Sequence, residues 1–259
     1  MGKRVYSVVI GTAVTMIRSM KWDVTVTGAE HIPTEGPAIL ASNHIGYLDF
    51  VFSGYAARDR GRRVRFLAKK EIFDKRGVGW LMRQMGHIPV DRHGAAQDSM
   101  RAAEAELRRG EIIGMFPEAT ISPSFVPRAG KTGTVRIAQA TGAPLLPVAL
   151  WGTHRILTKW RPKNFQRKIP ITVAVGPAIP LTADDDPEVK TKELMAAICE
   201  LLDEAQRAYP AEPASAEDAW WLPAHLGGSA PSFDEAEARL VEERERKAAK
   251  RKQEPGPTP

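Results

Sequence analysis

Residues 38–49 of the chain read AILASNHIGYLD, and the fold expected for the rest follows from this stretch. Residues 38–41 are a short, uninterrupted apolar run, which is typical of a strand buried on both faces of a sheet. The run ends at the polar residues 42–44, and the pattern over 47–57 then favours a helix. A short buried strand that leads directly into a helix is the repeating unit of parallel α/β sheets.

The same alternation of apolar runs and helical patterns extends in both directions from this stretch. Further strands are expected at 22–27, 64–68, 88–90, 112–116, 145–150 and 171–175, and helices at 3–20, 71–85, 95–109, 132–141 and 187–208. The sequence therefore predicts an α/β fold with a mostly parallel central sheet flanked by helices on both faces.

Composition divides the 259 residues into three expected parts. Residues 1–20 form an N-terminal helix, amphipathic or largely apolar, and 21–209 form the α/β domain. Residues 210–259 follow as a Pro- and Ala-rich linker and a charged tail. Because apolar residues are scarce there, the tail is interpreted as either a free helix or disordered chain. The apolar residues 220–222 either dock on the domain or lie at a membrane interface.

The N-terminal helix has two interpretations. Lys3 and Arg4 precede an apolar run over 5–17, which is shorter than the roughly 20 residues that span a bilayer. The helix either packs on the protein core or lies in a membrane interface, with Arg18 and Lys21 at the lipid headgroups. No longer apolar stretch follows, so we expect a chain that is soluble or lies on one face of a membrane.

The charge balance favours anionic partners. Lys and Arg number 37 against 31 Asp and Glu, a net charge of +6. This suits phosphate-bearing lipids, coenzyme A, nucleic acid or an anionic membrane face. Cys199 is the single cysteine, which excludes an internal disulfide and a cysteine cluster for zinc. A basic run lies within residues 58–70 and is interpreted either as a solvated face or as a surface that attracts the phosphates of lipid or coenzyme A. Its members are Arg58, Arg60, Arg62, Arg63, Arg65, Lys69 and Lys70.

His44 and Asp49 carry the chemical signal. A loop that enters a helix can bring the Asp49 carboxylate onto one nitrogen of the His44 ring. The carboxylate then fixes the tautomer and stabilises the imidazolium, while the other nitrogen takes a proton from a substrate alcohol. Six histidines give this spacing by chance in roughly one chain in four, so the pair alone does not identify an enzyme.

Three further blocks lie at predicted strands or strand edges. They are residues 86–92 (GHIPVDR), 115–120 (MFPEAT) and 143–150 (APLLPVAL). Ligands of parallel sheets bind beyond the carboxyl ends of the strands, so we expect Asp91, Arg92 and Glu118 to gather near His44. The simpler alternatives are a surface ion pair between Asp91 and Arg92, and a helix cap at Glu118.

Together these blocks resemble those of the 1-acylglycerol-3-phosphate acyltransferase family, within the wider glycerophospholipid acyltransferases. The family order is Asn-His-x4-Asp, a Gly-x-Ile-x-x-x-Arg type, Phe-Pro-Glu-Gly, and an apolar block with a Pro-Val core. All four occur here in that order, within about residues 20–180. Residues 70–71 and 130–133 look like secondary family features, and 220–228 (WWLPAHLGG) resembles the tails of actinobacterial members.

The resemblance implies an enzyme of phospholipid biosynthesis. It would move a fatty acyl group from acyl-CoA or acyl-carrier protein to a hydroxyl of lysophosphatidic acid or a related glycerol-phosphate lipid. The resemblance implies no metal and no cofactor, and a peripheral or monotopic position on the cytoplasmic face of the cell membrane. His44 would be the general base and Asp49 its orienting partner. The residues expected to bind substrate are Asn43, Arg92, Glu118, Thr120, Arg128 and Lys131, and those expected to shape the acyl site are Pro147 and Val148.

Two positions depart from the family pattern. The usual Gly after the Glu is Ala119, and the Arg that often follows the Thr is Ile121. A phosphate clamp would then be rebuilt from Arg92, Arg128 or Lys131, or the headgroup would differ.

Other functions stay open at this point. A thioesterase or lipase would use the pair of His44 and Asp49 to activate water, although the chain lacks a Gly-x-Ser-x-Gly elbow. A non-catalytic protein that binds anionic lipid would not depend on His44. Nucleic acid is not expected as a partner, because no zinc, helix-turn-helix or aromatic RNA-binding motif accompanies the positive charge. The oligomeric state is not set by any motif.

Overall fold

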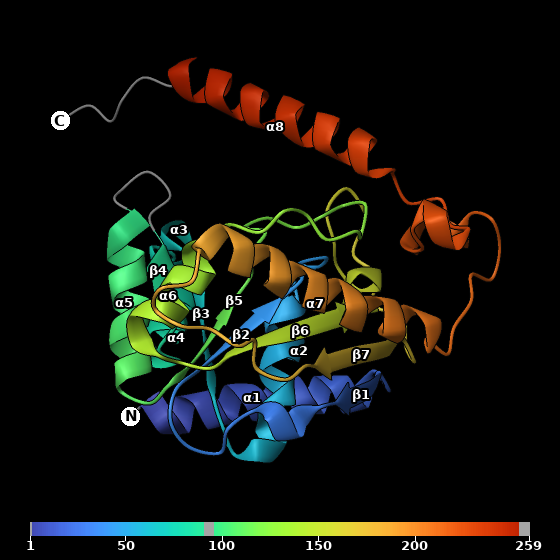
Figure 1. Ribbon diagram of the computed structural model, residues 1–259. Coiled ribbons are helices and arrows are strands. Elements are labelled where there is room, and N and C mark those ends of the chain that lie inside the picture. The colour runs from blue at the N-terminus through green and yellow to red at the C-terminus, as the bar shows by residue number, and fades with distance from the viewer. Residues whose placement is uncertain (1, 91–95, 254–259) are drawn as a thin grey trace. The chain divides into compact units, whose positions relative to one another are not determined.

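A seven-stranded sheet forms the centre of the α/β domain (Figure 1). The structure is a computed structural model that describes residues 2–90 and 96–253. The strands lie in the order β1-β7-β6-β2-β5-β3-β4. Their bounds are β1 (Asp23–Thr27), β2 (Ala38–Ser42), β3 (Val64–Lys69), β4 (Ile88–Val90), β5 (Ile112–Met115), β6 (Leu145–Trp151) and β7 (Pro170–Val175). Neighbouring strands in this sheet are parallel except β6 and β7, so the predicted mostly parallel sheet is confirmed.

The α-helices of the described residues also fall where the patterns predict them. They are α1 (Gly2–Ser19), α2 (Asp49–Ala56), α3 (Lys70–Phe73), α4 (Val78–Gln84), α5 (Ala96–Arg108), α6 (Gly133–Thr141), α7 (Pro187–Arg207) and α8 (Phe233–Gln253). The helical region 71–85 is divided at Gly77, whose φ of 78° is left-handed. After this turn α4 packs closely against α3. Gly79 permits the close approach, because a Cβ at this position would lie only 1.9 Å from the Phe73 carbonyl oxygen.

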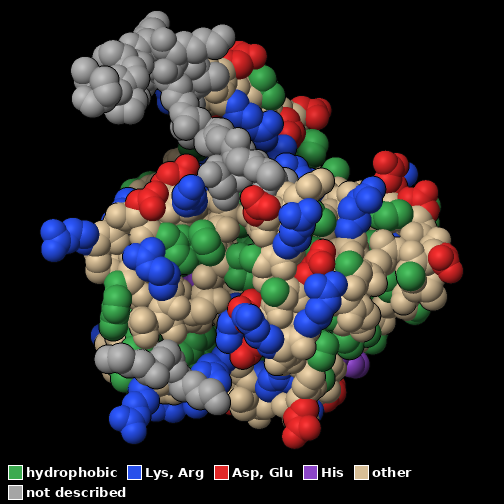
Figure 2. Space-filling model, turned by 90° about the vertical axis from the view of Figure 1, so that its left-hand side faces the viewer, with side chains coloured by type: hydrophobic (Ala, Val, Ile, Leu, Met, Phe, Trp, Pro, Cys, Tyr) green, Lys and Arg blue, Asp and Glu red, His purple; other side chains and the backbone are tan. Residues whose placement is uncertain are grey.

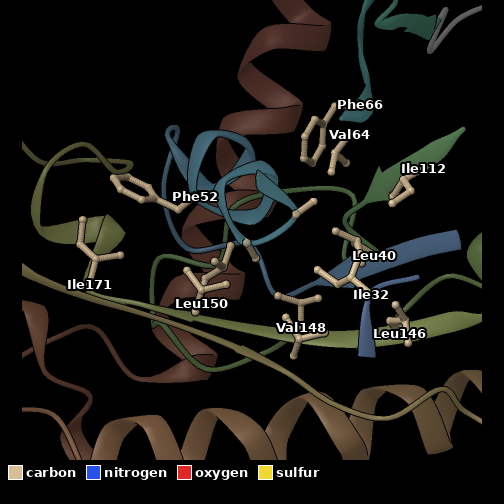
Figure 3. Packing of buried hydrophobic residues seen from close by; sticks show 14 of the residues in the cluster. Ile32, Leu40, Phe52, Val64, Phe66, Ile112, Leu146, Val148, Leu150 and Ile171 are labelled. Atoms are coloured by element: carbon tan, nitrogen blue, oxygen red, sulfur yellow. The ribbon is translucent and has the colours of Figure 1, made fainter. Parts of the chain in front are cut away.

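Two clusters of buried hydrophobic residues lie on opposite faces of the sheet. In β2, Ala38 and Leu40 belong to the first cluster and Ile39 and Ala41 to the second, as the alternation of side chains along a strand requires. The first cluster includes residues of α1 and α2, and Figure 3 shows Phe52 of α2 packed among its strand residues. The second includes residues of α5, α6 and α7. Helices therefore cover both faces, as predicted, and residues 38–41 of β2 are all apolar because the strand is buried on both sides.

Helix α1 packs on the core along one side and is exposed along the other. The Tyr6 hydroxyl accepts a hydrogen bond from the Val64 backbone N–H (3.1 Å) and lies 3.2 Å from the Val64 carbonyl oxygen. Ile17 belongs to the first cluster, whereas Val8 is 68% exposed and Met16 is 36% exposed. Core packing therefore accounts for one face of α1 and leaves apolar side chains on the other. Along the described part of the chain, no helix combines the length and apolar character that a bilayer crossing needs.

Much of the basic run of 58–70 binds other parts of the protein. Arg60 donates to the Ile32 carbonyl, and Arg62 donates to the carbonyls of residues 33, 36 and 110. Arg65 forms ion pairs with Glu106 and Glu111. Figure 2 shows Lys and Arg side chains interspersed with hydrophobic and acidic ones rather than gathered in one patch on the face in view. These arginines thus tie loops to the domain, a role that neither interpretation of the run foresaw.

A second compact unit consists of residues 122–126 and 212–259, as far as they are described. Trp221 is 1% exposed, and the rings of Phe125 and Trp220 meet edge to face with centroids 6.4 Å apart. Helix α8 begins with a capping box in which the Ser232 backbone N–H donates to the Glu235 carboxylate and the Glu235 N–H lies 3.3 Å from the Ser232 hydroxyl. Of the two interpretations of the tail, the helical one holds for these residues.

Candidate active site

The candidate site lies where the central strands of the sheet end. β2 has β5 and β6 as its neighbours, so the segments that follow these three strands meet at one edge. They are the loop 43–48, the segment 116–121 and the turn that begins at Gly152. Residues more than 100 positions apart in sequence are thereby brought into contact.

His44 and Asp49 form the predicted pair. The His44 Nδ1 lies 2.9 Å from Asp49 Oδ2, and the His44 side chain is 20% exposed whereas that of Asp49 is fully buried. Asp49 is the first residue of α2, where the positive end of the helix dipole favours a carboxylate. With Nδ1 directed at this carboxylate, the lone pair of a neutral imidazole resides on Nε2.

Asp49 also holds the loop that carries His44. Its Oδ2 accepts hydrogen bonds from the backbone N–H groups of Ile45 (2.7 Å) and Gly46 (2.8 Å). Its Oδ1 accepts from the Thr153 hydroxyl. A charge taken out of water needs such partners, and four of them surround this carboxylate. The loop and its carboxylate therefore form one rigid group.

The segment after β6 closes over the same loop. The Tyr47 backbone N–H donates to the Leu157 carbonyl at 2.9 Å, and the Thr158 hydroxyl donates to the Ile45 carbonyl at 2.6 Å. Gly46 permits the approach, because a Cβ there would lie 3.1 Å from the Leu157 oxygen. Sequence reasoning missed Thr153 and Thr158. No local pattern marks them, since both act through contacts made more than 100 residues away.

Glu118 approaches His44 from the backbone side. Its Oε1 accepts from the His44 backbone N–H (2.7 Å) and its Oε2 from the Arg128 backbone N–H (2.9 Å). The side chain is 3% exposed, and burial raises the pKa of Glu118 to about 8, opposed in part by these two bonds. The cap interpretation is wrong, because the next helix, α6, begins only at Gly133. Glu118 instead joins two loops.

Phe116 is a site residue that sequence reasoning did not single out. Its ring stacks on the His44 imidazole with centroids 4.1 Å apart and planes 18° apart, and the Phe66 ring lies 6.0 Å from the Phe116 ring in a stacked orientation. Phe66 can lie there because β5 has a Gly at 114, where a Cβ would meet the Phe66 ring at 2.1 Å. The sequence signal that could have identified Phe116 is its position two residues before Glu118, within one of the motif blocks.

Asn43, which was expected to bind substrate, lies directly after β2, and the two residues expected to shape the acyl site lie in β6. Asn43 is fully buried; its amide donates to the Leu150 carbonyl (3.0 Å) and accepts from the Leu150 N–H (2.7 Å). This geometry makes Asn43 a residue that positions His44, and substrate contact stays a prediction. Pro147 and Val148 lie in β6, paired with Ala41 and Ser42 of β2, and both are buried. Their expected role in shaping an acyl site likewise stays a prediction.

The residues expected to form a phosphate clamp are distributed around the segment 118–120. Thr120 accepts a hydrogen bond from Lys159 Nζ at 3.0 Å. Lys131 is exposed, and its backbone N–H donates to the Pro117 carbonyl. Arg128 is tied to Glu118 through its backbone. Arg92, with its neighbour Asp91, lies outside the described residues.

Comparison with known proteins identifies the family. Residues 23–151 match the sequence profile described as Acyltransferase. A 1-acyl-sn-glycerol-3-phosphate acyltransferase of Bacillus subtilis (strain 168) is 30% identical over 192 residues, 74% of this chain and 90% of that protein. The chain belongs to this acyltransferase family. Its chloroplastic member LPAT1 of Arabidopsis thaliana is 30% identical over 139 residues, 52% of this chain and only 38% of that longer protein.

A solved structure of the family supports the fold. The crystal structure of the 1-acyl-sn-glycerophosphate acyltransferase PlsC from Thermotoga maritima matches with a TM-score of 0.65 at 24% identity. The match covers 82% of this chain and 81% of that one, and at this identity it bears on the fold alone. The family resemblance inferred from four sequence blocks is thus confirmed, together with the α/β fold. Among the described residues, no group of three or more His, Cys, Asp or Glu is arranged to hold a metal ion.

Proposed function

We propose that this acyltransferase moves a fatty acyl group from a thioester donor to the free hydroxyl of lysophosphatidic acid or a related glycerol-phosphate lipid. The observation that carries the proposal is the distance of 2.9 Å between His44 Nδ1 and Asp49 Oδ2. The loop that carries His44 is held by hydrogen bonds to Asp49, Glu118 and Thr158. Acyl-CoA and acyl-carrier protein are the two donors that the proposal allows.

In the proposed reaction His44 is the general base. Its Nε2 takes the proton of the acceptor hydroxyl as that oxygen attacks the thioester carbonyl carbon. The positive charge that forms on the ring is stabilised by Asp49 through Nδ1 and by the stacked ring of Phe116. When the tetrahedral intermediate collapses, the C–S bond breaks, the ester forms, and the thiolate takes up the proton from Nε2. No enzyme nucleophile is needed, because the alcohol attacks directly.

The backbone N–H groups of residues 44–46 do not face the oxyanion of that intermediate. The backbone N–H groups of His44, Ile45 and Gly46 already donate to Glu118 and Asp49, and the Asn43 amide donates to Leu150. The proposal therefore keeps the base and its partner and assigns no oxyanion donor to the backbone of residues 44–46.

The proposed place of action is a membrane surface, in agreement with lipid as acceptor. Helices α1 and α4 pack together, and α4 exposes Val78 (49%) and Trp80 (50%). Tyr47 (49% exposed) and Phe50 (38%) flank Asp49 in sequence and add apolar surface beside the site. Exposed side chains of this kind insert into the interfacial region of a bilayer. The cytoplasmic face of the cell membrane is the side that the proposal names.

A matched pair of substitutions tests the membrane surface. Val78 on α4 and Val189 on α7 are exposed to 49% and 51%. Helix α4 packs against α1, which contributes to the first cluster, whereas α7 contributes to the second. Val78→Ser should weaken binding to anionic phospholipid vesicles about threefold to fourfold, because Val78 is 49% exposed and burial of that half contributes about half of the ~1.5 kcal/mol of a fully buried valine. Val189→Ser should leave vesicle binding unchanged. Equal effects of the two substitutions would overturn this placement.

The decisive experiment for the reaction is thiol release from palmitoyl-CoA and from palmitoyl-acyl-carrier protein. Each donor is supplied with and without lysophosphatidic acid, to the protein and to its His44→Ala variant. Release that requires the acceptor, yields phosphatidic acid and is lost in His44→Ala supports the proposal. Release without acceptor would make the protein a thioesterase. Lipid binding that survives His44→Ala, with no release from either donor, would make it a lipid-binding protein.

A further inference from the structure

A lysine outside the four sequence blocks lies beside the candidate site. The Lys159 ammonium donates a hydrogen bond to the Thr120 hydroxyl at 3.0 Å. Thr120 is two residues from Glu118, whose carboxylate is held 2.7 Å from the His44 backbone N–H. Between them Ala119 adopts a left-handed φ of 57°, which turns the chain sharply. The hydroxyl that holds Lys159 is thus fixed to the segment that holds His44.

The backbone next to Lys159 is fixed to the same loop from the other side. The preceding residue, Thr158, donates its hydroxyl to the Ile45 carbonyl at 2.6 Å. Leu157 accepts the backbone N–H of Tyr47 at 2.9 Å. Both ends of Lys159 are therefore held in place. Its backbone is fixed through its neighbours to the loop after His44, and its ammonium group is bound to the segment after Glu118.

The segment after Glu118 supplies no cation of its own. Position 121 is Ile121, where the family resemblance leads one to expect an arginine, and this side chain is only 4% exposed. The stretch 159–168, KWRPKNFQRK, carries five Lys or Arg and no acid. Its field attracts anions, and Lys159 is the member whose ammonium is shown bound at the site.

We propose that Lys159, with Thr120, binds the phosphate of the acceptor lipid in place of the missing arginine. The inference rests on the proposed function. An ammonium has three N–H donors, so it can bind the Thr120 oxygen and phosphate oxygens together. The Thr120 hydroxyl accepts from Lys159, and its own hydrogen can be donated to a second phosphate oxygen. The phosphate then lies within reach of the loop of His44, where the glycerol hydroxyl must be.

Substitution of Lys159 tests the proposal through the acceptor KM. Lys159→Met keeps the length of the side chain and removes the charge. We expect the KM for lysophosphatidic acid to rise about tenfold to hundredfold, the range for a lost hydrogen bond to a charged group. The kcat, the KM for the acyl donor and the activity toward monoacylglycerol, which has no phosphate, should stay within about twofold. Lys159→Arg should restore most of the acceptor KM.

Lys163→Met is the matched control. Lys163 lies in the same basic stretch and is exposed, so its loss changes the net charge equally. A similar rise in acceptor KM for Lys163→Met would show that the overall positive charge of the stretch, rather than Lys159 itself, attracts the phosphate, and would overturn the proposal. A rise in the donor KM for Lys159→Met would assign Lys159 to the phosphates of coenzyme A and overturn it as well. So would a fall in kcat with an unchanged acceptor KM, since that marks a structural role.

A binding measurement separates this inference from the proposed reaction. Trp160 adjoins Lys159, so intrinsic tryptophan fluorescence is used to follow binding of lysophosphatidic acid or monoacylglycerol in detergent micelles without catalysis. Trp160→Phe identifies the share of the other five tryptophans in the signal. The wild-type protein should prefer the phosphate-bearing lipid, and Lys159→Met should lose that preference. If no acyl transfer is found but this preference depends on Lys159, the reaction is wrong and the phosphate site stands. If transfer occurs and the preference survives in Lys159→Met, the phosphate site is wrong.

Discussion

Asp49 and Glu118 are two buried carboxylates that approach the same histidine in different ways. Asp49 meets the His44 ring at Nδ1 and accepts three further hydrogen bonds, from Ile45, Gly46 and Thr153. Glu118 meets the His44 backbone N–H and has one further bond, from the Arg128 N–H. One acid therefore orients the imidazole, and the other positions the chain that carries it.

The two carboxylates also differ in their surroundings. Asp49 lies at the start of α2, with four donors and the helix dipole to balance its charge. Glu118 has two donors and no helix, and burial together with the nearby Asp49 raises its pKa to about 8. The difference teaches that a buried acid in a family motif can act on substrate chemistry or on backbone geometry. Its hydrogen-bond partners decide between the two.

The largest expected effect is on turnover in Asp49→Asn. An amide can keep the bonds to Ile45, Gly46 and Thr153 but carries no charge to stabilise an imidazolium. We expect kcat to fall about 10²- to 10⁴-fold, with the melting temperature changed little. The Asp49→Asn, His44→Ala double variant should be no slower than His44→Ala alone, because the two residues act as one unit. A kcat within threefold of wild type would leave Asp49 with a structural role only.

Glu118→Gln should act mainly on stability. Its amide nitrogen would face one of two backbone N–H groups, leaving two donors opposed in a buried place. The free energy of unfolding should fall by about 1–3 kcal/mol, and kcat should fall with it as His44 shifts. Urea unfolding and steady-state kinetics measure the two effects. Glu200→Gln, at an exposed glutamate of α7, is the control and should change neither. A stable variant with only a raised acceptor KM would instead make Glu118 a substrate ligand, the role expected from the resemblance.

The pH dependence of stability sharpens the contrast further. Glu118 has a folded-state pKa of about 8, above its unfolded value of 4.5. Between these values the folded state holds a proton that the unfolded state lacks, so stability is full below pH 4.5 and is lost as the pH rises to 8. The expected slope from this group is up to about 1.4 kcal/mol per pH unit. Urea unfolding at pH 5, 6, 7 and 8 should show this decrease in the free energy of unfolding in the wild-type protein and not in Glu118→Gln. Equal slopes in both proteins would contradict it.

The smallest expected effect is a gain in stability from Ala119→Gly. Ala119 has a φ of 57°, which costs an L-residue about 1–2 kcal/mol, whereas glycine adopts it freely. The greater freedom of glycine in the unfolded chain offsets part of this gain. The net expectation is about 0.5–1 kcal/mol, or about 1–4 °C in melting temperature. Ala129→Gly, in the same loop region and without a positive φ, should change stability in the opposite direction. A loss of stability in Ala119→Gly would show that the left-handed turn is not strained.

Local sequence patterns were sufficient to predict the strands and helices and the contact between His44 and Asp49. The continuous apolar run 38–41 predicted a strand buried on both faces, and β2 is such a strand. The spacing of His44 and Asp49 predicted contact, because five residues of loop and helix start limit how far apart the two side chains can be. Both inferences depend on interactions within a few residues, which sequence order controls directly.

The partners of that pair were beyond local patterns. Thr153 and Thr158 reach the loop of His44, and Lys159 reaches Thr120, only because β6 lies next to β2 in the sheet. Strand order is set by which buried faces pack together over the whole chain, and no short stretch encodes it. For the same reason the bonds between the Asn43 amide and Leu150 in the neighbouring strand could not be foreseen from the sequence.

The sequence by itself determined the α/β class, the positions of the strands and helices, the acyltransferase family and the histidine with its acid. The tertiary structure alone decided what each buried carboxylate binds, which aromatic ring stacks on His44 and which lysine lies beside Thr120. The physical reason is range: hydrophobic periodicity and close spacing act along the chain, whereas these contacts arise only after distant strands pair and exclude water between them.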